Sequence, residues 1–322
     1  AGRPVVKRRL RRSEVVEFFK GLEPCLVGME ACATAHHWAR QLIALGHEVK
    51  LMPPAYVKAY VKRNKNDEAD AEAICEAVTR PSMRFVPIKD VDQQSVLMLH
   101  RARALLIRQR TMLVNALRAH MAEFGIIAPQ GLRNVEQLID AISDARTALP
   151  ELARSILLLV VAQLNDTAAR VRLLEARLAK WHGVNAVSRL LASVPGVGIM
   201  GASAIAATVT DPSLFRSGRE FAAWLGMTPR QNSSGGKERL GGVSKRGDKY
   251  IRSLLIAGAV AILRHARDRA TKDAEWLRGM LARKPAMVVA VALANRTARI
   301  VWAVMRRGSA YRATESLRQA AA

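Results

Sequence analysis

Three acidic residues near the start of the chain have the types and spacing that a divalent-cation site needs. Glu30 ends an apolar run, and Asp67 and Asp70 stand three apart at the start of a predicted helix. Residues at i and i+3 share one helix face, so these two carboxylates can point the same way. Carboxylate oxygens are the hard ligands that Mg²⁺ prefers, with water and phosphate in the remaining positions. The pattern predicts convergence on one Mg²⁺ for phosphoryl transfer; the alternative is that Asp67 only favours the helix dipole.

A glycine-rich stretch, residues 230–247, carries two serines among cations. Ser233 and Ser234 come directly before Gly235. A serine hydroxyl that attacks a phosphate needs charge neutralisation, which neighbouring cations supply. The cations that we predict to bind nucleic acid here are Arg230, Lys237, Lys245, Arg246 and Arg252. The alternative interpretation is a disordered Gly/Ser loop.

A turn at residues 194–198 precedes a predicted helix of small residues over 200–209. Its hydrophobic-Pro-Gly-hydrophobic-Gly order is typical of the hairpin in helix–hairpin–helix DNA-binding modules. Glycine lets the backbone approach a phosphate, and free N–H groups at the helix start bind it. Gly196 and Gly198 are therefore predicted nucleic-acid contacts; the alternative is tight helix packing.

The charge of the chain favours a polyanionic partner. Its 322 residues include 51 Lys and Arg against 27 Asp and Glu, a net charge of +24. Such a charge destabilises a compact state by self-repulsion unless an anion screens it. DNA or RNA fits better than a small acidic substrate, because each phosphate contacted releases counterions. A membrane surface is the competing polyanion, and a merely basic protein without such a partner is the remaining alternative.

The chain has no predicted signal peptide or membrane span. Its longest apolar run, residues 155–164, is shorter than the roughly 20 residues that a span needs. Cys25, Cys32 and Cys75 form no CxxC pair, which suits a reducing cytoplasm. The first residue is not Met, and residues 1–4 predict a turn into a strand over 5–10. A domain that starts in this way is expected to have lost a preceding strand.

The elements that must position these residues fall into three regions. Residues 1–90 alternate strand and helix signals, which predicts an α/β domain. Residues 91–182 carry leucines at helical spacing in two long segments, which predicts an antiparallel coiled-coil arm or, alternatively, a plain helical bundle. Residues 183–322 predict an all-α domain with the helix–hairpin–helix. The expected elements are strands at 24–30 and 47–52 and helices at 14–20, 34–45, 67–78, 248–264 and 287–305.

These constellations occur together, in the order of one known family. The chain resembles the DEDD-type transposases of the insertion-sequence-110 family, especially the eleven-eleven subgroup, relatives of the pilin-gene invertases. The resemblance covers nearly the whole chain. The residues that carry it are Val27-Gly28-Met29-Glu30-Ala31, Lys65-Asn66-Asp67-Glu68-Ala69-Asp70-Ala71, the 195–198 turn, Trp224-Leu225-Gly226-Met227-Thr228-Pro229-Arg230, Ser233-Ser234-Gly235 and Ser244-Lys245-Arg246-Gly247-Asp248 with Arg252.

The resemblance implies a fold and a chemistry. Family members combine an RNase H-like (RuvC-like) domain, whose four acids bind Mg²⁺, with a helical domain whose serine forms a phosphoserine link to DNA. Glu30, Asp67 and Asp70 match three of the acids, and Ser234 matches the serine, with Ser233 its neighbour. The family's first Asp lies on a strand upstream of residue 1. Members use a bridge RNA and act as homo-oligomers, dimers or tetramers, in the nucleoid-associated cytoplasm of bacteria.

The resulting hypothesis is a transposase that cuts and rejoins the DNA of an insertion sequence with Ser234 as nucleophile. One alternative is a truncated remnant that binds nucleic acid without catalysis. Another is a RuvC-like nuclease that cleaves with metal-activated water and no serine.

Overall fold

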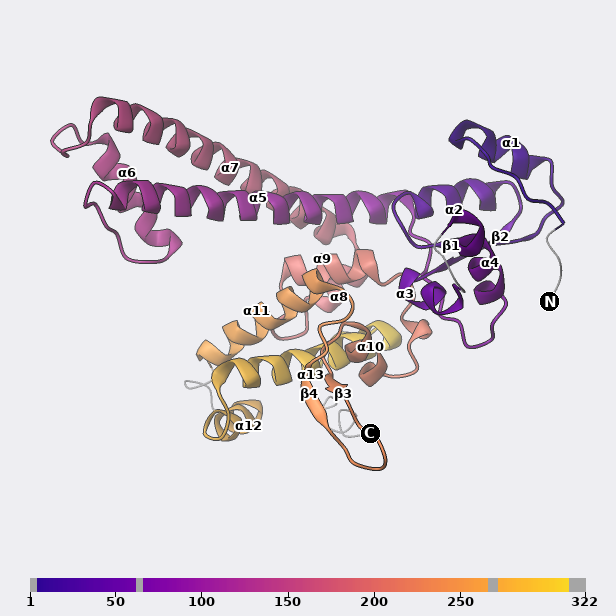
Figure 1. Ribbon diagram of the computed structural model, residues 1–322. Coiled ribbons are helices and arrows are strands. Elements are labelled where there is room, and N and C mark those ends of the chain that lie inside the picture. The colour runs from indigo at the N-terminus through magenta and orange to yellow at the C-terminus, as the bar shows by residue number, and fades with distance from the viewer. Residues whose placement is uncertain (1–4, 62–65, 266–271, 313–322) are drawn as a thin grey trace. The chain divides into compact units, whose positions relative to one another are not determined.

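The computed structural model describes residues 5–61, 66–265 and 272–312 (Figure 1). The chain forms two compact units. The first contains residues up to 94 together with 209–211, and the second contains residues 95–208 and those from 212 onward.

The first unit is built on two parallel strands. β1 (Leu26–Glu30) pairs with β2 (Glu48–Met52), and helix α2 (Ala35–Ala44) connects them. Such a strand–helix–strand crossover is the unit of α/β domains. Apolar side chains of β1, α2 and β2 form one buried cluster, so the alternation of strand and helix in the sequence is confirmed here. Gly46 has a φ of +94°, which allows the turn from α2 into β2.

Helix α4 (Asp67–Val78) packs across β1 at a glycine. A Cβ atom on Gly28 would lie 3.0 Å from Ile74 Cγ2 and 3.0 Å from Val78 Cβ, so the missing side chain lets the helix approach. Asn66 caps the helix by accepting a hydrogen bond from the backbone N–H of Ala69 at 2.7 Å. The smaller elements of this unit are the 3₁₀ helices η1 (Arg12–Glu14) and η2 (Lys58–Tyr60) and the helices α1 (Val15–Lys20) and α3 (Pro54–Val57).

The strand expected over residues 5–10 is wrong. None of these residues is in a strand, and Val5 and Val6 are exposed. Val5 and Val6 have the β-branched side chains typical of strands, but Lys7, Arg8 and Arg9 follow as consecutive cations. In the described part of the unit, this segment has no strand beside it to pair with.

Two long antiparallel helices lie side by side in the second unit (Figure 1). They are α5 (Val91–Ala122) and α7 (Glu151–Val184), with α6 (Val135–Ser143) packed against them at one end. Leu117 of α5 and Leu157 of α7 share the buried cluster at that end, whereas Val96 and Leu178 share another at the opposite end. A short 3₁₀ helix, η3 (Leu132–Asn134), precedes α6.

Among the residues that the structure describes, the rest of the second unit is helical apart from one hairpin. Helix α9 (Ile199–Thr208) is buried over most of its length, and α13 (Ala286–Arg307) buries one face along the entire helix. The hairpin joins β3 (Pro229–Gln231) to β4 (Leu240–Val243). The other elements are α8 (Ala186–Leu191), η4 (Pro212–Leu214), α10 (Gly218–Trp224), α11 (Lys249–His265) and α12 (Lys272–Leu281).

Two helices, α7 and α13, are long and apolar enough to cross a membrane by length and composition alone. The sequence expectation counted uninterrupted apolar runs, so it missed helices whose apolar residues are interrupted by an occasional charge. α13 buries eight residues, among them Leu293 and Val301, in the core of the second unit. A long apolar helix in the core of a protein has the same length and composition as a membrane span, so these two helices are weak evidence for a membrane.

Candidate functional site

The serine loop forms a β-hairpin, drawn in orange in Figure 1. The two strands are extended toward the tip by a bridge between Ser234 and Lys237, whose backbone N–H donates to the Ser234 carbonyl at 3.1 Å. Gly235 and Gly236 form the turn, with φ values of +56° and +76°. Two positive φ values in a two-residue turn are the signature of the I′ hairpin, which matches the twist of the strands. The alternative of a disordered loop is therefore not what the structure shows.

The two serines of the hairpin are in different environments. The Ser233 hydroxyl accepts a hydrogen bond from the backbone N–H of Arg239 at 3.1 Å, which ties it to the opposite strand. The Ser234 side chain is exposed at the turn and makes no hydrogen bond to any residue that the structure describes. A hydroxyl with no intramolecular partner can approach a bound phosphate without first breaking a bond.

Exposed cations lie along the hairpin and at its base. Arg230, Lys237, Lys245 and Arg246 are all exposed. None of these four side chains forms an ion pair within the described residues. Residues 229–242 are exposed without exception, so this surface is open to a ligand as large as a nucleic acid.

The base of the hairpin is closed by two glycines that interlock with backbone. A Cβ atom on Gly226 would lie 1.7 Å from the Arg246 carbonyl oxygen, and one on Gly247 would lie 1.9 Å from the Trp224 carbonyl oxygen. Both glycines have positive φ values, +71° and +91°. The Lys245 backbone N–H donates to the Gly226 carbonyl at 3.0 Å. This backbone clasp, formed by residues 224–228 and 244–247, fixes where the hairpin leaves the helical unit.

Arg252 has a different role from the one predicted. Its side chain is buried, 9% exposed, and Nη1 donates to the Leu225 carbonyl at 2.7 Å and to the Arg246 carbonyl at 3.4 Å. A buried guanidinium that is bound to two backbone carbonyls holds the clasp together, so Arg252 positions the loop and is not one of the exposed cations.

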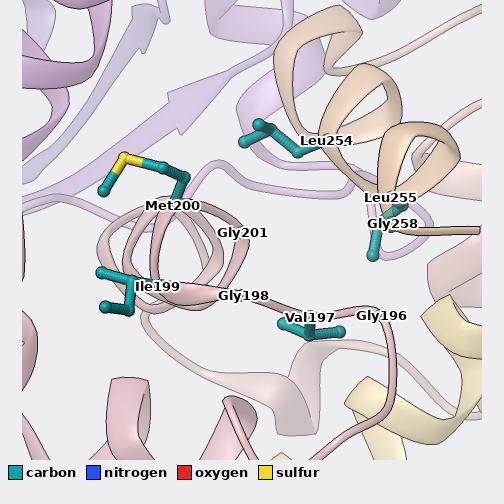
Figure 2. Close-up of a pocket in the computed structure, with 9 residues that line it drawn as sticks. All are labelled: Gly196, Val197, Gly198, Ile199, Met200, Gly201, Leu254, Leu255 and Gly258. Carbon is teal, nitrogen blue, oxygen red and sulfur yellow. The ribbon is translucent and has the colours of Figure 1, made fainter. Parts of the chain in front are cut away.

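The two glycines of the 194–198 turn also differ (Figure 2). Gly196 has a φ of +81°, and a Cβ atom on Gly258 of α11 would lie 1.9 Å from its carbonyl oxygen. Gly196 therefore allows two backbones to touch, which is the packing alternative. No heavy atom lies within 4 Å of a Cβ built on Gly198. Figure 2 shows the turn beside a pocket of about 320 Å³ that it lines together with Leu254 and Leu255.

A buried polar network joins the long helix α5 to the start of α11. His100 is 1% exposed; its Nδ1 lies 3.0 Å from the Tyr250 hydroxyl and its Nε2 lies 3.1 Å from Ser203 Oγ. Ser203 donates to the Ile199 carbonyl at 2.7 Å, so it can accept from His100 Nε2–H while Nδ1 accepts from Tyr250. Burial, and to a lesser extent the charge of Arg103, lowers the pKa of His100 to about 4.

The network also holds Tyr250, which lies shortly after the clasp. Tyr250 comes three residues after Gly247, and burial raises the pKa of its hydroxyl. Arg103, one turn after His100 on α5, forms an ion pair with Glu175 of α7 at 2.6 Å. Helix α5 is therefore connected through Tyr250 to the start of α11, which begins two residues after the clasp.

The three acids do not form the expected cluster. Glu30 is half-buried at the end of β1, Asp67 is exposed at the start of α4, and Asp70 is half-buried one turn along. Within the described residues, no three His, Cys, Asp or Glu side chains come together in a group that could hold a metal. The helix contacts β1 through Ile74 and Val78, farther along α4 than either Asp, and carboxylates brought close without a cation repel one another.

Comparisons with known proteins place the chain in a family. A model described as the transposase IS116/IS110/IS902 family matches residues 188–274, and a DEDD transposase model of IS110 matches residues 5–126. A putative transposase of Sinorhizobium fredii is 46% identical over 317 residues, which covers 98% of this chain and 82% of the relative. The chain belongs to the IS116/IS110/IS902 family of transposases. It is also similar to a probable family 20 transposase of Pseudomonas aeruginosa, 49% identical over 96% of this chain and 92% of the relative.

A further relative belongs to the subgroup that the sequence motifs indicated. The transposase for insertion sequence element IS1111A of Coxiella burnetii is 38% identical over 97% of this chain and 86% of the relative. Membership confirms that the protein is a transposase, an enzyme that cuts and rejoins DNA, with DNA as its partner, whereas the serine nucleophile stays a prediction. The DEDD domain implies an RNase H-like fold, of which the described residues show the parallel pair β1 and β2.

Transposases of this DEDD type generally use a divalent metal. Glu30, Asp67 and Asp70 offer the right donors, because carboxylate oxygens suit a hard cation. Their placement fits less well, since the described residues bring no three such side chains together. The residues present therefore match the metal in donor type but not in arrangement.

Several residues that shape the site were not found from the sequence. Gly226 and Gly247 belong to motifs of the family, but the sequence does not show that they close the hairpin base. A glycine in a sequence does not reveal whether its φ is positive. His100 and Tyr250 are 150 positions apart, so no local pattern connects them. A lone histidine in a leucine-rich helix gave the only signal, and such a residue is usually part of a core.

Proposed function

We propose that this transposase attacks DNA with the Ser234 hydroxyl and forms a covalent phosphoserine intermediate. The observation that carries the proposal is the exposed I′ hairpin, which presents the unpartnered Ser234 hydroxyl opposite Lys237, with Arg230 on the preceding strand. In the first step, Ser234 Oγ bonds to the scissile phosphorus and the bond from phosphorus to one sugar oxygen breaks. The serine proton passes to solvent, and the departing sugar oxygen takes a proton to become a hydroxyl.

The second step reverses the first on a different strand end. A sugar hydroxyl of the new partner strand attacks the phosphoserine, its oxygen bonds to phosphorus, and Ser234 leaves and regains a proton. One phosphate ester is exchanged for another in each step, so no external energy source is required. The neighbouring cations stabilise the negative charge that grows on the phosphate oxygens during each attack.

Two further properties are proposed for the protein. It uses a bridge RNA to select its DNA sites, as the family resemblance implies. The net charge of +24 supports this, because a protein so basic can bind RNA phosphates in addition to those of DNA. It acts as a homo-oligomer in the bacterial cytoplasm, associated with the nucleoid. Exposed apolar residues at heptad spacing on the long helices support the oligomer: Met98, Leu105 and Met112 on α5, and Leu152, Leu159 and Leu173 on α7.

Mg²⁺ is the metal that we propose for the acidic residues. Glu30, Asp67 and Asp70 would contribute oxygen ligands, with one further acid from the family's first strand. Helix α4 packs on β1 at Gly28, so the helix that carries Asp67 and Asp70 lies against the strand that ends in Glu30. Binding of Mn²⁺, followed by its paramagnetic signal, should weaken in Asp70→Asn both with and without DNA. Equal binding by this variant would remove Asp70 from the ligand set.

The nucleophile is tested by trapping the covalent intermediate. A DNA substrate nicked beside the cleavage site loses the strand end needed for rejoining, so the protein–DNA adduct accumulates. Ser234→Ala should give no adduct and keep its DNA affinity, whereas Ser233→Ala should still form one. Adduct formation by Ser234→Ala but not by Ser233→Ala would move the nucleophile one residue upstream. Cleavage without any adduct would favour a metal-dependent nuclease, and binding without cleavage would favour an inactive remnant.

A further inference from the structure

Three arginines gather where helix α10 packs on helix α13. The contact is made through Gly218, on which a Cβ atom would lie 3.0 Å from both the Cα and the carbonyl oxygen of Arg299. This close approach places Arg219, the next residue of α10, beside Arg299. Arg296 stands three residues before Arg299 and therefore lies on the same face of α13.

The arginines are crowded enough to affect one another. Burial lowers the pKa of Arg299, and the charges of Arg219 and Arg296 lower it further. Three guanidinium groups held together repel one another, and an anion bound among them would relieve that repulsion. Arg296 is also held in place, because its guanidinium lies 5.2 Å from the centre of the Trp276 ring.

The cluster lies close to the base of the serine hairpin. Asn295, adjacent to Arg296, donates a hydrogen bond from its side chain to the Met227 carbonyl at 3.1 Å. Met227 comes two residues before β3 and belongs to the backbone clasp. The cluster therefore lies next to the clasp from which the hairpin extends; Arg219 is exposed, and Arg296 and Arg299 are half-buried.

We propose that Arg219, Arg296 and Arg299 bind the phosphodiester backbone of the DNA next to the strand that the hairpin attacks. The inference rests on the proposed function and adds a second contact region to it. Guanidinium groups bind phosphate oxygens in pairs through their fork of N–H donors. Arg296 and Arg299 are about 4.5 Å apart along the helix axis, from three steps of 1.5 Å. Two arginine side chains at this spacing can contact neighbouring phosphates of one strand.

DNA is a better fit than a small anion or RNA. Arg219 is exposed, so the cluster opens to solvent and does not enclose a small ligand. Family membership makes DNA the partner of this enzyme, and the cluster adjoins the hairpin that carries the proposed nucleophile.

The experiment measures how DNA affinity depends on salt. Binding of a fluorescent DNA duplex is followed by anisotropy over a salt series for wild type, for Arg219→Gln with Arg296→Gln, and for Arg306→Gln. Arg306 is an exposed cation on the same α13 helix, so its variant controls for a loss of charge outside the cluster. Loss of two phosphate contacts should lower the slope of log K against log salt by about 1.8, at roughly 0.9 for each contact. Arg306→Gln should leave the slope unchanged.

A second variant separates binding from folding. Arg299→Lys keeps the charge but loses the fork, so it should weaken DNA binding while its thermal unfolding stays close to that of wild type. If Arg299→Lys unfolds at a clearly lower temperature than wild type, the single variant Arg219→Gln, at an exposed position, tests the proposal instead. It should lower the slope of log K against log salt by about 0.9.

The possible outcomes distinguish this inference from the proposed function. A steep wild-type slope with no difference between the cluster variants and Arg306→Gln would overturn the inference and leave the function intact. No binding of the duplex by wild type would overturn both. The same titration with a single-stranded RNA gives the remaining outcome: a reduced slope for RNA alone would show that the cluster does not bind DNA. Ser234→Ala should retain the full wild-type slope, because its hydroxyl carries no charge.

Discussion

Acidification should destabilise the second unit through His100. The ring is 1% exposed and its pKa lies at about 4, below the ordinary value of 6.5, mainly because burial disfavours the charged form. Unfolding restores the ordinary value, so the unfolded chain binds the proton more readily than the folded one. The stability that neutral His100 provides is therefore complete above pH 6.5 and is lost as the pH falls from 6.5 to about 4.

The size of the effect follows from the difference between the two pKa values. A difference of roughly 2.5 units corresponds to about 3 kcal/mol, at about 1.4 kcal/mol for each unit. A typical domain is stable by about 5–15 kcal/mol, so this one side chain would remove a large part of the total. The loss should also loosen the contacts to Tyr250 and Ser203, because a charged ring cannot accept the hydrogen bond from the tyrosine hydroxyl.

Urea unfolding at a series of pH values tests this reasoning. The matched variant is His100→Gln, which does not titrate and retains a donor for Ser203. It should be less stable than wild type at neutral pH, and the difference should shrink by about 3 kcal/mol as the pH falls to about 4. Other titrating groups affect both proteins equally and cancel in the difference. Parallel pH profiles for the two proteins would show that His100 is not responsible.

Two further changes test the hairpin base and the arm. Gly247→Ala places a Cβ atom 1.9 Å from the Trp224 carbonyl at a φ of +91° and should lower the free energy of unfolding by about 2 kcal/mol or more, measured in urea. Gly242→Ala, where no atom lies within 4 Å, is the matched control and should change stability little; equal effects would refute the clasp. Met112→Glu should reduce the oligomer size measured by light scattering, because Met112 is 69% exposed in the apolar stripe formed by Met98, Leu105 and Met112 on α5. An unchanged mass for that variant would exclude this part of the stripe from the interface.

The parts of the fold that the sequence predicted are those decided by local signals. The helix Asp67–Val78 begins after a capping Asn66 with acids in its first turn, and its predicted bounds are confirmed. The strands β1 and β2 are apolar runs between turns and are confirmed with small changes at their starts. The hairpin was missed although Gly235-Gly236 is a known I′ signal, because the many cations and glycines around it favoured a loop interpretation.

The parts that could not be predicted depend on partners far away in the sequence. Arg252 was counted among the exposed cations because a sequence does not show that Leu225 and Arg246 turn their carbonyls toward it. Gly196 was assigned to a phosphate because its contact with Gly258, 62 positions away, is visible only in three dimensions. The i, i+3 spacing of Asp67 and Asp70 predicts that these two acids share a helix face. It does not tell how far that face lies from Glu30 at the end of the strand, so convergence of all three could not be predicted.

The exposure of the whole hairpin has a consequence for the timing of catalysis. Residues 229–242 bury no side chain, so beyond the clasp the described contacts of the hairpin are its own: backbone hydrogen bonds, the turn, and the bond from the Arg239 N–H to the Ser233 hydroxyl. An isolated two-stranded hairpin is only marginally stable in water, and ordering it costs conformational entropy. DNA contacts along the hairpin would supply the cost of fixing it in one position, so sites that make fewer contacts would bind more weakly. The Ser234 hydroxyl, the proposed nucleophile, would then be held most firmly while a well-matched substrate is bound, and a poorly matched duplex would dissociate uncut.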